Sequence, residues 1–103
     1  MMSTSVFIRH VTQPGERETV HSIWERHMAP NITTNGDHEA YFYCFDDNNQ
    51  DVIVVYQQYT NAESAASFLQ TPAYLAYLQE VEPYLMGPAE VTAASPIWVK
   101  KTS

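Results

Sequence analysis

The chain has 103 residues, a length typical of one domain with one modest hydrophobic core. Its formal net charge is −7, and no lysine or arginine lies between His27 and Val99. This distribution argues against binding to nucleic acid, which needs clustered cations, and against phosphate-rich cofactors. The single cysteine, Cys44, excludes an internal disulfide. Because no signal peptide or transmembrane pattern is present, we expect a cytoplasmic protein without membrane contact.

The first strand is expected at residues 5–12. Strand alternation places Val6, Ile8 and His10 on one face, and Phe7, Arg9 and Val11 on the other. Pro14-Gly15 ends this strand, and a helix is predicted over residues 16–31, with Pro30 marking its end. The helix carries one apolar stripe at i, i+3, i+4, i+7 and i+8, formed by Val20, Ile23, Trp24, His27 and Met28.

A polar loop over residues 31–37 leads to two strands at 38–45 and 52–59, which a hairpin loop joins. Both faces of these two strands are apolar, so we expect both faces to be covered. Cys44 is interpreted as a small core residue. By contrast, His10 and His38 lie at strand ends and are expected in solvent.

Two short helices follow, separated by a break at Thr71-Pro72. Asn61 is expected to cap the first of them, and Pro72 suits the first turn of the second. The core-facing stripe of the second helix is predicted to contain Leu75, Leu78, either Val81 or Glu82, and Leu85. The last strand is expected over residues 89–99, with an interruption at Ser95-Pro96 because proline cannot donate to a strand ladder.

These elements form the order βαββαβ, with the second helix split in two. This order is that of an α+β, ferredoxin-like domain with an antiparallel sheet, which we expect to span residues 1–103. Helices cover only one face of such a sheet, whereas the strand pattern requires a cover on both. We therefore expect a homodimer in which two sheets pair face to face as an α/β barrel.

The run from the third strand into the split helix resembles the antibiotic biosynthesis monooxygenase family, and the resemblance extends from Val6 to Val99. Pro14-Gly15 also matches the usual opening of the family's first helix. Gln57 stands where a glutamate is common, and Phe68 and Ala73 stand where histidines are common. The positions that correspond to the family's run, including these three departures, are Tyr56, Gln57, Tyr59, Asn61, Ala65, Ala66, Phe68, Thr71, Pro72 and Ala73.

The resemblance implies a monooxygenase that oxidises a flat, electron-rich substrate, such as an anthrone or a quinol, with O2. Members of the family need neither metal nor flavin, so no cofactor is expected. Haem degradation is disfavoured, because Phe68 and Leu78 stand near the positions of the tryptophan and the axial histidine of haem-degrading relatives. The alternatives are a small-molecule-binding domain without activity and an isomerase or decarboxylase that consumes no O2.

Two residues are candidates for catalysis. A tyrosine at the end of the third strand matches the family's aromatic position, and Tyr59 could orient a substrate hydroxyl or stabilise an enolate. His27 is the candidate base, although helical spacing alone also explains it as a histidine at the edge of the apolar stripe. No metal site is expected. The candidates for substrate binding are Trp24, Tyr41, Tyr43, Tyr56, Gln57 and Phe68.

Overall fold

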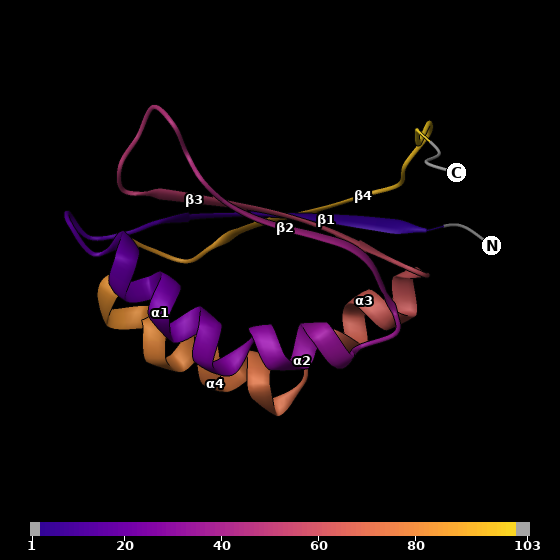
Figure 1. The fold of residues 1–103 in the computed structure, drawn as a ribbon, viewed down its shortest axis with the longest axis horizontal. Coiled ribbons are helices and arrows are strands. Elements are labelled where there is room, and N and C mark those ends of the chain that lie inside the picture. The colour runs from indigo at the N-terminus through magenta and orange to yellow at the C-terminus, as the bar shows by residue number, and fades with distance from the viewer. Residues whose placement is uncertain (1–2, 101–103) are drawn as a thin grey trace.

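A computed structural model describes residues 3–100 and confirms the α+β, ferredoxin-like order (Figure 1). The four strands form one antiparallel sheet in the order β2-β3-β1-β4. All helices lie on one face of this sheet (Figure 1). The elements are β1 (Thr4–Val11), α1 (Arg17–His27), α2 (Ala29–Thr34), β2 (His38–Phe45), β3 (Val52–Tyr59), α3 (Ala62–Phe68), α4 (Pro72–Val81), the 3₁₀ turn η1 (Glu82–Tyr84) and β4 (Glu90–Ala94).

The core lies between the sheet and the helices, because alternate residues of β1 and β3 face the helices. The predicted apolar stripe lies on α1 and on Met28, the residue that follows it, and Val20, Ile23 and Met28 are buried. No helix within residues 3–100 is long and apolar enough to cross a membrane.

The first helix ends earlier than predicted, and the expected loop over residues 31–37 is wrong. α1 ends at His27, and after one intervening residue the chain forms α2, in which Pro30 lies in the first turn. A proline at the start of a helix loses no hydrogen bond, so Pro30 begins α2 instead of ending α1. Side chains of α2 also donate to carbonyl oxygens four residues earlier, as Thr33 does to Ala29 at 2.8 Å.

The start signals of the split helix are confirmed. The side chain of Asn61 accepts a hydrogen bond from the backbone N–H of Ser64 at 2.8 Å, and Thr71 accepts one from Tyr74 at 3.2 Å. Pro72 occupies the first turn of α4.

The predicted core-facing stripe of α4 is correct only in part, because Val81 is buried and Leu78 and Leu85 pack against the core, but Leu75 does not. Tyr74, Tyr77 and Val81 are the buried residues of this helix, whereas Leu75 is half exposed. The tyrosines can face the core because a phenol buries a large ring, and in Tyr77 the hydroxyl also finds a polar partner inside.

Three further expectations are corrected. β4 ends at Ala94, before the proline, and residues 95–100 leave the sheet. Cys44 is exposed, because it points to the face of the sheet opposite the helices. His10 is 3 % exposed instead of solvated, since it faces the helices beside Tyr77, whose hydroxyl lies 3.2 Å from its Nε2.

The face of the sheet opposite the helices, here called the open face, is covered by no helix of residues 3–100 (Figure 1), and aromatic side chains occupy its centre. Phe7, Tyr56 and Phe42 lie side by side across three strands of this face. The ring centroids of Phe7 and Tyr56 are 5.1 Å apart, and those of Phe42 and Tyr56 are 6.0 Å apart.

Candidate functional site

A cluster of polar and aromatic side chains lies inside the layer between sheet and helices, where α3 meets the ends of β2 and β3. We call it the His38 cluster, and it consists of His38, Gln57, Tyr59 and Phe68. Gln57 is 2 % exposed, and its Oε1 accepts a hydrogen bond from the hydroxyl of Tyr59. The ring of His38 lies 4.5 Å from that of Tyr59 and 4.6 Å from that of Phe68, measured between centroids.

His38 presents an N–H group to this interior. The amide nitrogen of Asn35 lies 3.0 Å from Nδ1 of His38 and can only donate, so the neutral ring carries its proton on Nε2. Nε2 is buried and has no hydrogen-bond partner among residues 3–100. Burial lowers the pKa of His38, and Gln57 and Asp37 oppose this shift only in part. The ring is therefore neutral at pH 7.

An irregularity in β2 brings His38 to this face. The pairing of β2 with β3 shifts register between His38 and Ala40, so that His38 lies opposite Tyr59. Strict alternation would place His38 on the open face with Phe42. A β-bulge re-aims the side chain that precedes it, which is why sequence alternation alone does not identify His38 as a site residue.

Further aromatic side chains extend the interior toward α1. The indole N–H of Trp24 donates to the hydroxyl of Tyr41 at 3.1 Å, and the rings of Trp24 and Tyr43 are 4.2 Å apart between centroids. Burial raises the pKa values of Tyr41, Tyr43 and Tyr59, so all three phenols stay protonated at neutral pH. The hydroxyl of Tyr43 has no hydrogen-bond partner in the described part of the chain.

A cavity of about 270 Å³ lies between α2 and α3, next to the His38 cluster. Two residues connect it to His38, because Phe68 and Asn35 both line the cavity and contact the histidine. The other lining groups are hydroxyls, amides and one carboxylate, contributed by Asn31, Thr34, Asp37, Ser64, Ser67 and Thr71. This lining suits a small molecule with polar substituents and one apolar ring.

The structure brings together only some of the residues that the sequence singles out. Gln57, Tyr59 and Phe68 belong to one cluster, and Trp24, Tyr41 and Tyr43 lie in the same layer. Tyr56 does not, because it lies on the open face, where its hydroxyl donates to Gln58 at 2.9 Å.

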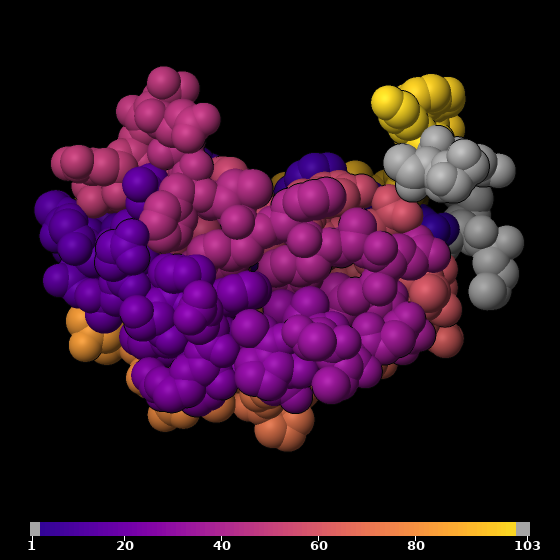
Figure 2. Space-filling view, in the orientation of Figure 1, coloured from indigo at the N-terminus to yellow at the C-terminus, as the bar shows by residue number. Residues whose placement is uncertain are grey.

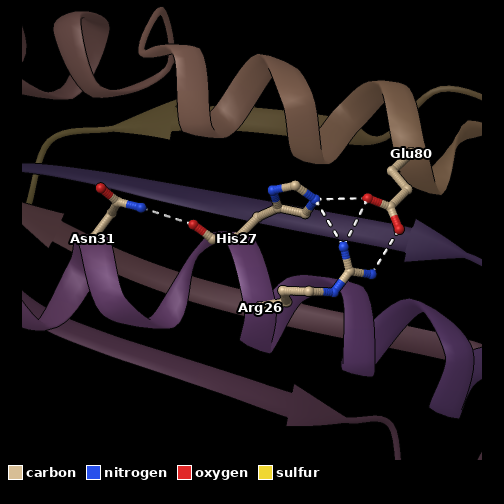
Figure 3. Close-up of polar contacts among 4 residues, drawn as sticks. All are labelled: Arg26, His27, Asn31 and Glu80. Atoms are coloured by element: carbon tan, nitrogen blue, oxygen red, sulfur yellow. Dashed lines mark hydrogen bonds and ion pairs between the residues drawn. The ribbon is translucent and has the colours of Figure 1, made fainter.

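His27 lies outside the cluster, where α1 meets α4 (Figure 3). Its Nε2 is 2.7 Å from Oε1 of Glu80, and Arg26 binds both oxygens of the same carboxylate at 3.1 and 2.6 Å. The hydrogen bonds from Arg26 and then His27 lower the pKa of Glu80 to about 2. Asn31 donates to the backbone carbonyl of His27 at 2.8 Å (Figure 3). The contacts of Arg26 and His27 with Glu80 join α1 to α4.

Within residues 3–100, no three side chains of the metal-binding types histidine, cysteine, aspartate and glutamate lie close enough together to hold a metal ion.

Comparison with known proteins finds likeness in structure but not in sequence. No family model matches the sequence, and the curated proteins include no significant match. Among solved structures, a protein of Nitrosomonas europaea, provisionally described as an antibiotic biosynthesis monooxygenase, superposes with a TM-score of 0.83 at 13% identity over 94% of this chain and 92% of its own.

A second structure described as an antibiotic biosynthesis monooxygenase gives a TM-score of 0.81 at 10% identity, covering 91% of this chain and 98% of that one. The protein Rv0793 from Mycobacterium tuberculosis gives 0.81 at 19% identity, covering 98% and 99%. The fold of this chain is therefore that of the antibiotic biosynthesis monooxygenase structures.

Proposed function

We propose that the protein is a monooxygenase that needs no metal or flavin and oxidises a small, neutral, hydroxylated aromatic compound such as a quinol or an anthrone. The observation that carries the proposal is the His38 cluster, in which three polar side chains are enclosed by aromatic rings. Native proteins rarely bury a hydrogen-bond donor without a partner. Of the few such side-chain groups within residues 3–100, Nε2 of His38 belongs to the ring that contacts Asn35 and Phe68 of the cavity lining, which supports a ligand there. The likeness in fold to the two monooxygenases described above supports the same reaction class.

In this proposal the substrate occupies the cavity between α2 and α3, and its oxygen reaches the His38 cluster past the ring of Phe68. His38 donates its Nε2–H to that oxygen and stabilises the phenolate or enolate form of the substrate, while the proton that the substrate loses passes to solvent through the cavity and is recovered by the oxygen atom that leaves as water. Tyr59 fixes the amide of Gln57 through their hydrogen bond. The ring of Phe68 shields the anion from water on the side of the cluster.

The substrate itself supplies the electrons. For an anthrone-type substrate, a CH2 group reacts with O2 to give a C=O group and one molecule of water. One oxygen atom enters the product, the other leaves as water, and the carbon loses the four electrons that O2 gains. The protein is required only for orientation and for stabilising the anion, which requires no cofactor.

The charge of the protein favours a neutral substrate. The chain has a net charge of −7, and the cavity is lined by Asp37 but by no cation. An anionic substrate would be repelled as it approached, whereas a quinol or anthrone is uncharged until it meets the donor inside.

We further propose that the active form is a homodimer. The open face carries exposed Phe7 and Phe42, with exposed fractions of 45% and 58%. An uncovered apolar sheet of this kind is unfavourable in water, and a second copy of the chain supplies a matching cover. Sedimentation equilibrium of the wild-type chain and of Phe42→Lys tests this part, because the lysine should shift the chain to the monomer.

The test of the reaction is O2 uptake by the purified protein against a panel of anthrones and naphthoquinols. We expect uptake to continue with chelator present, and one atom of ¹⁸O2 to appear in the product. His38→Phe and Tyr59→Phe should each lower kcat at least tenfold. Tyr56→Phe is the matched control, because it also deletes a phenol hydroxyl from β3 but on the opposite face of the sheet. This variant should retain full activity.

The outcomes separate the proposal from its rivals. Turnover without O2 consumption would identify an isomerase or decarboxylase. Compounds that raise the melting temperature but are not converted would identify a binding domain. Activity that survives in both His38→Phe and Tyr59→Phe would overturn the assignment of the site.

A further inference from the structure

The C-terminal residues 95–100 form an apolar arm that contributes nothing to the core of its own chain. Ile97, Trp98 and Val99 are consecutive and have exposed fractions of 94%, 81% and 52%. Figure 2 shows these residues, in yellow, rising above the body of the molecule. They rise on the side of the open face, as the β2–β3 loop does at the other end of the sheet (Figure 1). Three adjacent exposed apolar side chains, one of them tryptophan, are typical of a binding segment.

A groove of matching character lies elsewhere on the chain. It lies between α4 and β4, has a volume of about 510 Å³, and is lined mainly by apolar side chains. It exists because the buried face of α4 packs over β1, as the contact of Tyr77 with His10 shows, while Val91 of β4 stays half exposed on the helix side. The lining that matters here is Tyr74, Leu78, Leu85, Pro88 and Val91, with Glu82 as its only charged residue.

The arm does not point toward the groove of its own chain. The groove opens on the helix side of the sheet, whereas the arm leaves β4 on the opposite side (Figure 1). In a dimer paired through the open faces, the arm instead points toward the second copy. Six extended residues span about 20 Å, of which the four from Ser95 to Trp98 account for about 13 Å, and packed sheets lie about 10 Å apart. The arm is therefore long enough to cross the interface at the β4 edge of the partner, from where the indole of Trp98 extends toward the groove.

The charges of the arm and the groove are complementary. Lys100 and Lys101, which follow the apolar triplet, are the only lysines of the chain. Glu82 lines the groove, and without these two lysines the rest of the chain would carry a net charge of −9. A cationic end on an apolar segment favours docking on an acidic copy of the same chain.

We propose that residues 95–100 of one copy bind in the α4–β4 groove of a second copy, with Trp98 filling the groove and Lys100 beside Glu82. This exchange rests on the proposed homodimer but not on the proposed reaction. In each protomer the partner's arm covers the half-exposed Val91, so the groove is closed only in the dimer.

The test follows Trp98 in the intact chain. The difference in fluorescence between the wild-type chain and Trp98→Phe isolates this indole from Trp24. We expect Trp98 to be shielded from acrylamide at concentrations where the chain is dimeric and to be quenched freely after dilution to monomers. Leu78→Glu, in the groove, should expose Trp98 at all concentrations. Leu75→Glu is the control, because Leu75 is already half exposed on α4 and does not line the groove.

Mixing two defective chains tests whether the arm docks on its own copy or on the other. A chain truncated after Ser95 has a groove but no arm, and Leu78→Glu has an arm but no groove. Neither mutant homodimer can form the contact between arm and groove. In the mixed dimer, the arm of the Leu78→Glu chain can bind the groove of the truncated chain, so the contact forms once. We expect each defect to weaken dimerisation at least tenfold, and mixing to restore both shielding of Trp98 and part of the lost affinity.

Several results would overturn the proposal. A dimer in which Trp98 is as exposed as free indole refutes the exchange while leaving the open-face dimer intact. Shielding that does not recover on mixing assigns the arm to its own chain and also refutes the exchange. A chain that stays monomeric at all concentrations refutes both the exchange and the homodimer, but leaves the O2-uptake test unaffected.

Discussion

His10 should make the stability of this protein fall as the pH drops through the weakly acidic range. The side chain is 3 % exposed, and burial lowers its pKa to about 4 from the ordinary value of 6.5. The folded state therefore binds fewer protons than the unfolded state between these values, so protonation favours unfolding. The contribution of neutral His10 is fully present above pH 6.5 and is lost as the pH falls toward 4.

The magnitude follows from the same two pKa values. A difference between 6.5 and about 4, at about 1.4 kcal/mol per pH unit, corresponds to about 3 kcal/mol of unfolding free energy. This is a large share of the roughly 5–15 kcal/mol by which proteins of ordinary stability stay folded. His10→Gln should remove most of the slope, because glutamine does not titrate and its amide can hydrogen-bond the hydroxyl of Tyr77 either as donor or as acceptor.

The assay is urea unfolding followed by circular dichroism, at fixed protein concentration, in steps from pH 7.5 to pH 4. We expect the wild-type chain to lose stability more steeply than His10→Gln over the lower part of this range. His38→Gln serves as a second comparison, because burial lowers the pKa of His38 as well. Parallel pH profiles for the wild-type chain and His10→Gln would refute the assignment of the slope to His10.

Three other substitutions probe features outside the site. Asn61→Ala removes the cap of α3 and should lower the unfolding free energy by about 1 kcal/mol in urea unfolding. Ile53→Ala empties a fully buried position of β3 and should cost about 2–5 kcal/mol, unless the neighbouring side chains collapse into the space. In the wild-type chain, the unfolding free energy should fall between pH 4.5 and pH 2, because the carboxylate of Glu80 becomes protonated there and releases Arg26 and His27. Glu80→Gln should reduce this fall in unfolding free energy and should leave O2 uptake unchanged.

The elements of the fold were predictable because their signals are local. Alternation identified the first strand, and an apolar run rich in β-branched and aromatic residues identified the third. Asn61, Thr71 and Pro72 identified the starts of α3 and α4 through short-range hydrogen bonding and the fixed backbone of proline. The prediction that Pro30 ends a helix failed because a proline is equally compatible with the start of the next one. Which of these two roles it takes depends on packing beyond the local sequence.

The site was predictable only in part, because its members come together through long-range geometry. Tyr59, Gln57 and Phe68 were identified by resemblance, and they do lie together. His38 was missed because the bulge at the start of β2 reverses the face expected from strict alternation. His27 has helical spacing that fits either role, and only its contact with Glu80 shows that it joins α1 to α4.

The glutamine at position 57 is consistent with the rest of the His38 cluster. A carboxylate at this buried position would need a compensating cation, and no lysine or arginine lines the neighbouring cavity. A neutral amide avoids that cost and still accepts the hydroxyl of Tyr59. Because burial also keeps His38 neutral, the cluster can stabilise an anion by donating hydrogen bonds but carries no charge of its own. Under the proposed function, such a site would favour a substrate acidic enough to ionise when hydrogen-bonded, which is a property of anthrones and quinols and not of unactivated hydrocarbons.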